Sequence, residues 1–170
     1  IEAAGARVIP LEAERRSLNP LAAGYAAGQL AALLKEIRPD IVHCIALRSI
    51  LLGGTAAAMA GIDRRVFALT GLGYLGARTD LVGRAARRAA RMALSSPPLR
   101  SPGTRFLLEN EEDAAFLRLD PAGAKVTIVG GAGIDPDRLR PSSPPPGPPF
   151  KVALVSRMLW SKGIDLAVEA

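Results

Sequence analysis

The chain has 170 residues, a formal net charge of +6 and a single cysteine, Cys44. It holds no run of about 18 uncharged apolar residues, so we expect no transmembrane helix, and one cysteine excludes an internal disulfide. Because Cys44 sits in a strand-like run, we expect it to be a small buried hydrophobic residue in a reducing cytoplasm. With one histidine and no cysteine pair, we expect no metal site.

Strand-like and helix-like patterns alternate along the chain. Short apolar runs predict strands at Ala6–Leu11, Asp40–Ile45, Arg65–Thr70, Arg105–Glu109 and Lys125–Val129. Helical periodicity predicts helices from Pro20, capped by Asn19, to the residues before Pro39, and at Arg48–Ala60, Leu81–Leu94 and Asn110–Leu119. This order predicts an α/β fold with a Rossmann-like parallel sheet and flanking helices that cover both of its faces.

A proline-rich stretch suggests where one domain ends. Pro141–Pro149 has the sequence PSSPPPGPP, which excludes a helix and an interior strand and favours a stiff linker. A surface loop within one domain would look similar, but a new strand–loop–helix pattern follows directly. We therefore expect a partial N-terminal domain at 1–140, a linker at 141–149 and the start of a second domain at 150–170.

The pattern after the linker suggests an anion site. Lys151–Val155 is a short apolar run that suits a buried strand, and Arg157 follows it. Ser161 is placed to cap a helix whose first turn would hold Lys162 and Gly163. A helix N-terminus with two cations favours a di- or triphosphate. The alternative is that both cations are surface side chains beside a loop.

A glycine-rich loop follows the strand at Arg65–Thr70. Gly71–Gly76 has the sequence GLGYLG, which matches GxGxxG, but no helix opens at these glycines and no acid lies about 20 residues on. A loop that lines a ligand cleft at the carboxyl end of a strand is favoured over a dinucleotide site. His43, the only histidine, falls near the end of another strand, where a structural role and a cleft role both remain open.

The positive charge is concentrated in one segment. Between Arg64 and Arg105 there are nine arginines and one acid, Asp80. Four of these arginines share one helical face, at positions i, i+3, i+4 and i+7: Arg84, Arg87, Arg88 and Arg91. Such a stripe fits a solvated face, an anionic membrane surface or a lipid diphosphate. A nucleic-acid-binding module is disfavoured, because the segment offers few aromatic residues for base stacking.

Several motifs resemble one enzyme family. RMLWSKGIDLAVEA at Arg157–Ala170 and GAGIDPDRLRP at Gly131–Pro141 are similar to segments of GT-B glycosyltransferases of family 4. DIVH at Asp40–His43, TGLGY at Thr70–Tyr74 and Asn110 at the end of FLLEN match the family in order and spacing. Together they resemble the branch that builds capsule, O-antigen and related glycans on polyprenyl-diphosphate lipids.

The resemblance implies roles for individual residues. Those on the donor side would be Arg157 and Lys162, which hold the donor diphosphate, with Gly133, Asp135 and Asn110 lining the cleft. Those on the acceptor or membrane side would be Gly73 and Tyr74, together with the four arginines of the stripe. Many members carry a histidine near the transferred sugar, where this chain has Thr70 and Gly71. The catalytic residues stay unidentified, with His43, Thr70 and Gly71 as cleft candidates.

The implied activity is retaining transfer of a sugar from a UDP-linked donor to a lipid-linked or other glycan acceptor, in surface polysaccharide synthesis. The resemblance implies no cofactor, no metal and no nucleic-acid partner, and a cytoplasmic protein held peripherally at the inner face of the plasma membrane. We expect the chain to be a fragment, cut at both ends and inactive alone. The alternatives are a nucleotide-sugar epimerase or hydrolase of the same architecture, and a basic nucleic-acid-binding module.

Overall fold

The computed structural model describes residues 5–11, 19–72, 78–130, 133–143, 147–149, 151–156, 158 and 162–170. The chain divides into two compact units, residues 1–130 and residues 131–170. Among the described residues, no helix combines the length and the apolar character that a membrane span requires.

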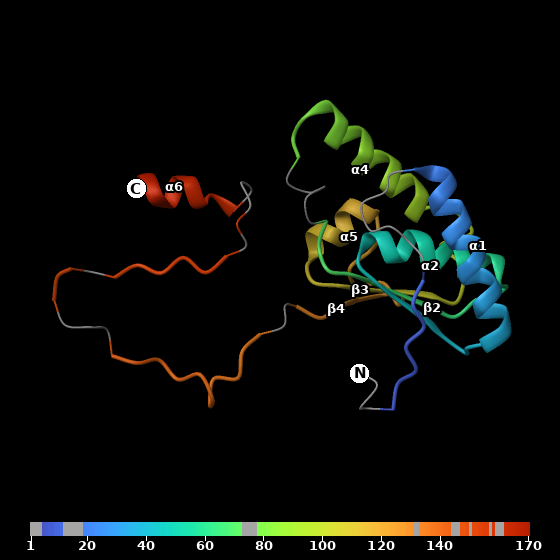
Figure 1. The fold of residues 1–170 in the computed structure, drawn as a ribbon, viewed down its shortest axis with the longest axis horizontal. Coiled ribbons are helices and arrows are strands. Elements are labelled where there is room, and N and C mark those ends of the chain that lie inside the picture. Colours follow the sequence, from blue (N-terminus) through green and yellow to red (C-terminus); the bar gives the residue numbers. More distant parts are fainter. Residues whose placement is uncertain are drawn as a thin grey trace. The chain divides into compact units, whose positions relative to one another are not determined.

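The first unit is built on a four-stranded parallel sheet. Its strands are β1 (Val42–Ile45), β2 (Arg65–Leu69), β3 (Thr104–Leu108) and β4 (Val126–Ile128). They lie side by side in the order β1-β2-β3-β4, and every neighbouring pair is parallel (Figure 1). The predicted α/β fold with a Rossmann-like parallel sheet is confirmed.

The described helices of this unit are α1 (Pro20–Ile37), α2 (Leu47–Met59), α4 (Leu81–Leu94) and α5 (Glu111–Leu117). Side chains cap three of them. The Asn19 side chain accepts a hydrogen bond from the Leu21 N–H at 2.9 Å, and Asp80 and Asn110 cap α4 and α5. The predicted bounds of α1 and α4 are confirmed, because caps and an apolar stripe are local signals.

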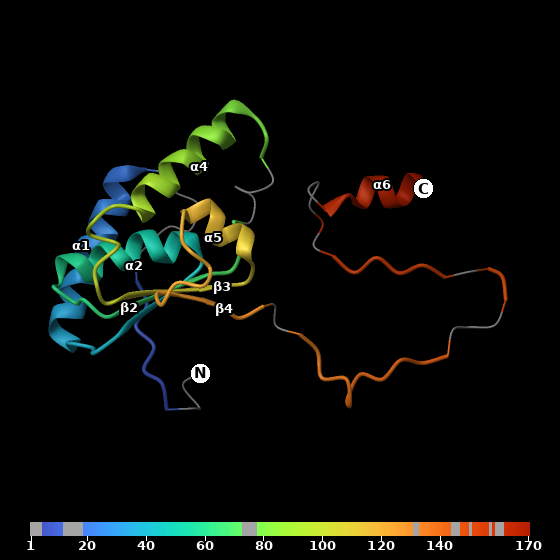
Figure 2. The same cartoon turned by 180° about the vertical axis from the view of Figure 1, so that it is seen from behind.

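The expectation that helices cover both faces of the sheet is wrong for the described residues of this unit. In the two opposite views, α2, α4 and α5 lie on the same side of the sheet (Figures 1 and 2), and α1 packs against α2. The strand order explains this arrangement: each crossover advances to the next strand in the same direction, and right-handed crossovers of this kind place the helices between the strands on one face. Coverage of both faces requires a reversal of strand order.

The core lies between the sheet and these helices. Phe67 on β2 and Phe106 on β3 are buried, and their rings meet edge to face at a centroid distance of 5.7 Å. Helix α2 approaches the sheet closely at Gly54, where an added Cβ would lie 2.8 Å from Cζ of Phe67. Cys44 is buried as expected, and burial raises the pKa of its thiol to about 11.

Two predicted strands are absent from the described residues. Residues 6–11 and 151–155 form no strand, and Val152 and Val155 are each 94% exposed. An apolar run becomes a strand only when a neighbouring strand pairs with its backbone, and none of the described residues does so here.

The second unit contains one helix, α6 (Ile164–Glu169), in its described part. Lys162 and Gly163 precede this helix and do not form its first turn, which corrects the sequence expectation. Gly163 has a φ of 63° and occupies the N-cap position, a backbone conformation that glycine adopts without steric cost. Ser161, the predicted cap, lies outside the described residues.

Candidate active site

The carboxyl edge of the sheet gathers the ends of all four strands. Cα pairing aligns Ile45 with Ala68, Leu69 with Leu108 and Leu108 with Ile128. The segments that follow the strands therefore emerge at one edge, where ligands of open parallel sheets bind.

Thr70 and Gly71 lie at this edge directly after β2. Thr70 is exposed, and Gly71 has a φ of 79°. A residue with a side chain rarely adopts this conformation, so glycine turns the chain out of the sheet here. Gly73 and Tyr74, which the sequence also placed in this loop, lie outside the described residues.

Asn110 lies at the same edge, after β3, where it caps α5. Its side-chain oxygen accepts a hydrogen bond from the Asp113 N–H at 2.8 Å. Asp113 is buried, and its Oδ2 has no hydrogen-bond partner among the described residues. Burial raises the pKa of this carboxyl, the Asn110 side chain lowers it, and the charges of Glu109 and Glu112 raise it further. Asn110 thus has a structural task that accounts for its position without a ligand.

Ala46, after β1, is a feature of this edge that sequence reasoning missed. Its φ is 70° and its ψ is 153°, and its N–H donates to the Ala68 carbonyl at 2.8 Å. Such a backbone costs on the order of 1–3 kcal/mol in a residue other than glycine. No side chain of the described residues caps the N-terminus of α2 that follows. No residue pattern predicts this conformation at an alanine, because a positive φ is normally marked by glycine or asparagine.

His43 lies away from this edge. It is the second residue of β1, pairs in register with Val66, and is exposed on the sheet face opposite the helices. Thr70 follows four residues after Val66, so about 13 Å of strand length separates the level of His43 from that of Thr70. The structure does not bring His43 together with Thr70 and Gly71.

The described donor-side residues other than Asn110 belong to the second unit. Gly133 has a φ of 66°. The Asp135 carboxylate accepts hydrogen bonds from the N–H groups of Asp137 at 3.0 Å and Arg138 at 3.3 Å, which closes a turn. Lys162 is exposed just before α6, and Arg157 lies outside the described residues.

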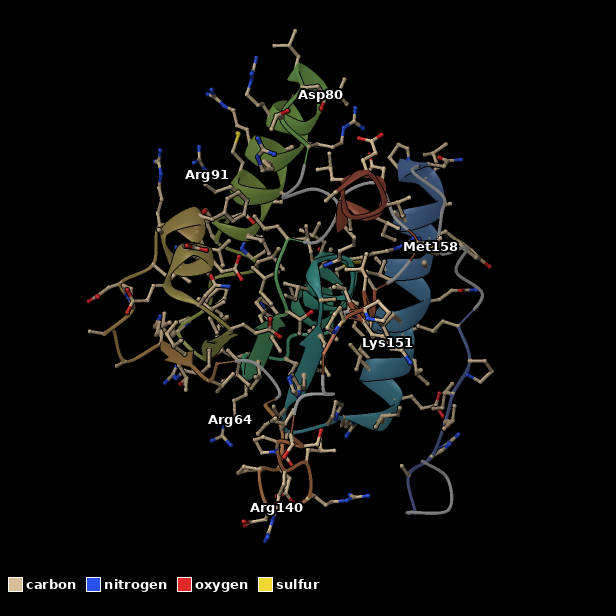
Figure 3. The ribbon with its side chains drawn as sticks, turned by 90° about the vertical axis from the view of Figure 1, so that its left-hand side faces the viewer. Arg64, Asp80, Arg91, Arg140, Lys151 and Met158 are labelled. Atoms are coloured by element: carbon tan, nitrogen blue, oxygen red, sulfur yellow. The ribbon has the colours of Figure 1, made fainter. Side chains whose placement is uncertain are left out.

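The four arginines of the stripe all lie on α4 but differ in exposure. Arg84 and Arg88 are exposed, whereas Arg87 and Arg91 are half-buried, and Arg87 donates to the Arg78 carbonyl. Figure 3 shows Arg91 projecting from α4, with Asp80 at the start of the helix. The predicted helical face is therefore present, with Arg84 and Arg88 as its most accessible members.

A hollow of about 530 Å³ lies at the opposite, amino edge of the sheet. The ends of α1 and α2 and the segments before β1 and β2 line it, including Lys35, Arg38, Asp40, Asp63 and Arg64. Its charges are mixed, and helix C-termini present carbonyl groups that disfavour an anion. The hollow therefore lacks the features of a diphosphate site. We place the candidate active site at the carboxyl edge instead, where the segments that follow the parallel strands emerge together.

A comparison with known families decides the assignment of the chain. A family model described as glycosyl transferase 4-like matches residues 1–96, which is more than half of the chain. The chain belongs to the glycosyl transferase 4-like family. The match covers this chain from residue 1 through α4, so it includes Ala46, Thr70 and the arginine stripe.

This glycosyl transferase 4-like chain has no match among curated proteins. The family assignment indicates a glycosyltransferase. The partners of this class of enzyme are, in general, a nucleotide-sugar donor and a glycan acceptor. Within the part of the chain that the structure describes, no cluster of histidine, cysteine and carboxylate side chains could hold a metal ion.

Proposed function

We propose that this glycosyltransferase transfers a sugar, with retention at the anomeric carbon, from a UDP-linked donor to a polyprenyl-diphosphate-linked glycan in surface polysaccharide synthesis. The family match over residues 1–96 is the observation that carries the proposal. It favours sugar transfer over the epimerase, hydrolase and nucleic-acid-binding alternatives. The parallel sheet adds a common exit edge, because the segments that follow Ile45, Leu69 and Leu108 leave it at the same end.

In this proposal the second unit binds the donor diphosphate. Arg157 and Lys162 would neutralise the negative charge that develops on the leaving group, which is electrostatic stabilisation of the transition state. The exposure of Lys162 beside α6 supports this role, because its ammonium group is accessible to a ligand. Gly133 and Asp135 would shape the neighbouring turn, and Pro141–Pro149 would link the two domains.

The first unit would present the acceptor side. Thr70 and Gly71 leave the sheet at its carboxyl edge, and the loop they begin leads into α4. The arginines of α4 would hold the enzyme peripherally at the anionic inner face of the membrane, beside the lipid diphosphate of the acceptor. Their support is the exposure of Arg84 and Arg88 on a helix that contains no acidic residue.

Donor titration of a Lys162→Ala variant in the intact protein tests the donor site. A charge-assisted hydrogen bond contributes about 1.5–3 kcal/mol, so we expect donor affinity to fall about tenfold or more while the free energy of unfolding stays unchanged. Lys151→Ala is the matched control, because Lys151 is also an exposed lysine of the second unit, and it should bind donor as the wild type does. Wild-type donor affinity and turnover in Lys162→Ala would contradict the assignment.

A further inference from the structure

The outward side of α4 carries large apolar side chains as well as arginines. Leu81 is 73% exposed, Val82 61% and Met92 63%. With 3.6 residues per turn, Leu81, Ala85 and Met92 fall on one line along the helix, and Val82 and Ala89 fall beside it. We call these five residues the outer ridge.

The packing of α4 explains why the outer ridge faces outward. The buried residues of this helix are Gly83, Ala90 and Leu94, which lie on the opposite side from the ridge at spacings of seven and four residues. Gly83 and Ala90 are small and Leu94 packs inward, whereas Leu81, Val82 and Met92 project away from the rest of the first unit. Arg84 and Arg88 run along one border of the ridge, so cations and apolar groups share a single exposed surface.

The start of α4 is fixed by a local cap. The Asp80 carboxylate accepts a hydrogen bond from the Gly83 N–H at 3.1 Å and pairs with the Arg78 guanidinium, with Nε and Oδ1 2.9 Å apart. Arg78 lowers the pKa of Asp80 to about 2, so this anchor is ionised at neutral pH. A Cβ added at Gly83 would lie 2.9 Å from the Arg78 carbonyl oxygen. These contacts fix the residue at which the helix begins, and the burial of Ala90 and Leu94 sets the side that faces inward.

We propose that α4 lies in the interface of an anionic lipid bilayer, with the outer ridge inserted at the boundary between headgroups and acyl chains and Arg84 and Arg88 on lipid phosphates. This inference rests on the proposed membrane attachment and adds to it an apolar contact. Charge complementarity favours an anionic bilayer as the binding partner, because the exposed face of α4 offers cations and apolar groups but no acid. A bilayer with anionic headgroups supplies both phosphates and hydrocarbon to such a helix.

The position of the helix agrees with an acceptor that arrives in the membrane. Helix α4 follows the loop that leaves the carboxyl edge at Thr70, so Leu81 and Val82 begin the ridge on the side of the candidate active site. A lipid-linked diphosphate in the bound leaflet would lie at the level of the arginines. Insertion of the ridge would thus hold the sheet edge next to the headgroups.

Cosedimentation of the intact chain with vesicles tests the ridge. The vesicles are phosphatidylcholine with phosphatidylglycerol, at low and at high salt, and phosphatidylcholine alone. Removing two inserted side chains in Leu81→Gln with Met92→Gln should weaken binding to anionic vesicles about tenfold or more, and the loss should persist at high salt, where apolar contacts remain. Arg84→Gln with Arg88→Gln should weaken binding mainly at low salt.

A matched control separates the ridge from apolar exposure in general. Ile37 at the end of α1 and Met59 at the end of α2 are also about half exposed, but neither lies beside an arginine stripe. Ile37→Gln with Met59→Gln should bind vesicles as the wild type does. Circular dichroism and thermal unfolding confirm that each variant remains folded.

An environment-sensitive dye reports insertion directly. Attached at Ala85→Cys, in the middle of the ridge, it should shift to a shorter emission wavelength on anionic vesicles. The same dye at Glu36→Cys on α1 should not shift. Cys44 is buried and its thiol stays protonated at neutral pH, so the introduced cysteine is the one that reacts.

The outcomes separate failure of the ridge from failure of the attachment. No binding of the wild type to anionic vesicles at low salt would overturn both. Binding that the arginine variant loses and the ridge variant keeps, with no dye shift, would overturn the ridge alone and leave an electrostatic attachment. Self-association in solution that the ridge variant abolishes, without vesicle binding, would assign the ridge to a protein contact and overturn the proposal.

Discussion

Two groups of arginines from the basic segment between Arg64 and Arg105 differ in their surroundings: one group is exposed and the other points into the protein. On α4, Arg84 and Arg88 face outward. Arg65 at the start of β2 is buried, and it donates from Nε to the Ile62 carbonyl at 2.6 Å and from Nη1 to the Pro98 carbonyl. Arg100 donates from Nε to the Leu94 carbonyl at 2.9 Å and from Nη2 to the Leu117 carbonyl.

The inward arginines act as structural ties. Arg100 joins the last carbonyls of α4 and α5, and its guanidinium carbon lies 5.7 Å from the centre of the Phe106 ring. A cation at a helix C-terminus also complements the helix dipole. The positive charge of the segment therefore overstates what the surface presents, because Arg65 and Arg100 are engaged with backbone carbonyls.

The largest expected effect comes from the inward group. Arg65→Met keeps an unbranched side chain but leaves the Ile62 and Pro98 carbonyls without their donors, so we expect the free energy of unfolding to fall by about 3 kcal/mol. Arg64→Met is the matched control, because Arg64 is the exposed neighbour in the sequence and should change stability little. Urea unfolding measures both. Equal stability of the two variants would remove the distinction between inward and outward arginines.

The second test uses Cys44, whose thiol feels the charge of Arg65. Burial raises the pKa of Cys44 to about 11, and Arg65 lowers it in part. Because this folded pKa exceeds the ordinary value of 9.0, the unfolded chain loses its proton first as pH rises. Stability should therefore be fully present below pH 9 and decrease between pH 9 and about 11, by about 1 kcal/mol per pH unit.

Two variants check this reasoning. Cys44→Ala removes the titrating group and should abolish the part of the alkaline slope that it causes. Arg65→Met removes the charge that lowers the thiol pKa, so the slope should extend to higher pH. An alkaline slope that is identical in the wild type and Cys44→Ala would show that burial does not perturb this thiol.

The smallest expected effect belongs to the outward group. Arg84→Gln with Arg88→Gln should change the free energy of unfolding by no more than about 0.5 kcal/mol, because like charges at i and i+4 repel by about 0.2–0.5 kcal/mol. We expect the double variant to be slightly more stable than the wild type at low salt and equally stable at high salt. Thermal unfolding at two salt concentrations measures it. A large destabilisation would mean that these arginines are also structural ties.

The sequence alone determined the features that depend on neighbouring residues. Asn19 and Asn110 begin helices as expected, because a capping side chain bonds to backbone N–H groups two or three residues away. The four strands from Val42 to Ile128 followed from short apolar runs between helices. The parallel α/β fold and the family resemblance rest on these same local patterns.

Only the tertiary structure determined how these elements pack against one another. The strand order set α2, α4 and α5 on one face of the sheet. Cys44 packs on that face, so the neighbouring His43 points to the other one, two residues before the end of β1. Packing also turned Arg65 inward and Leu81 and Met92 outward, although the sequence marks them only as a cation and two apolar residues. The direction of a side chain depends on what packs against its element, and segments distant in the sequence supply that packing.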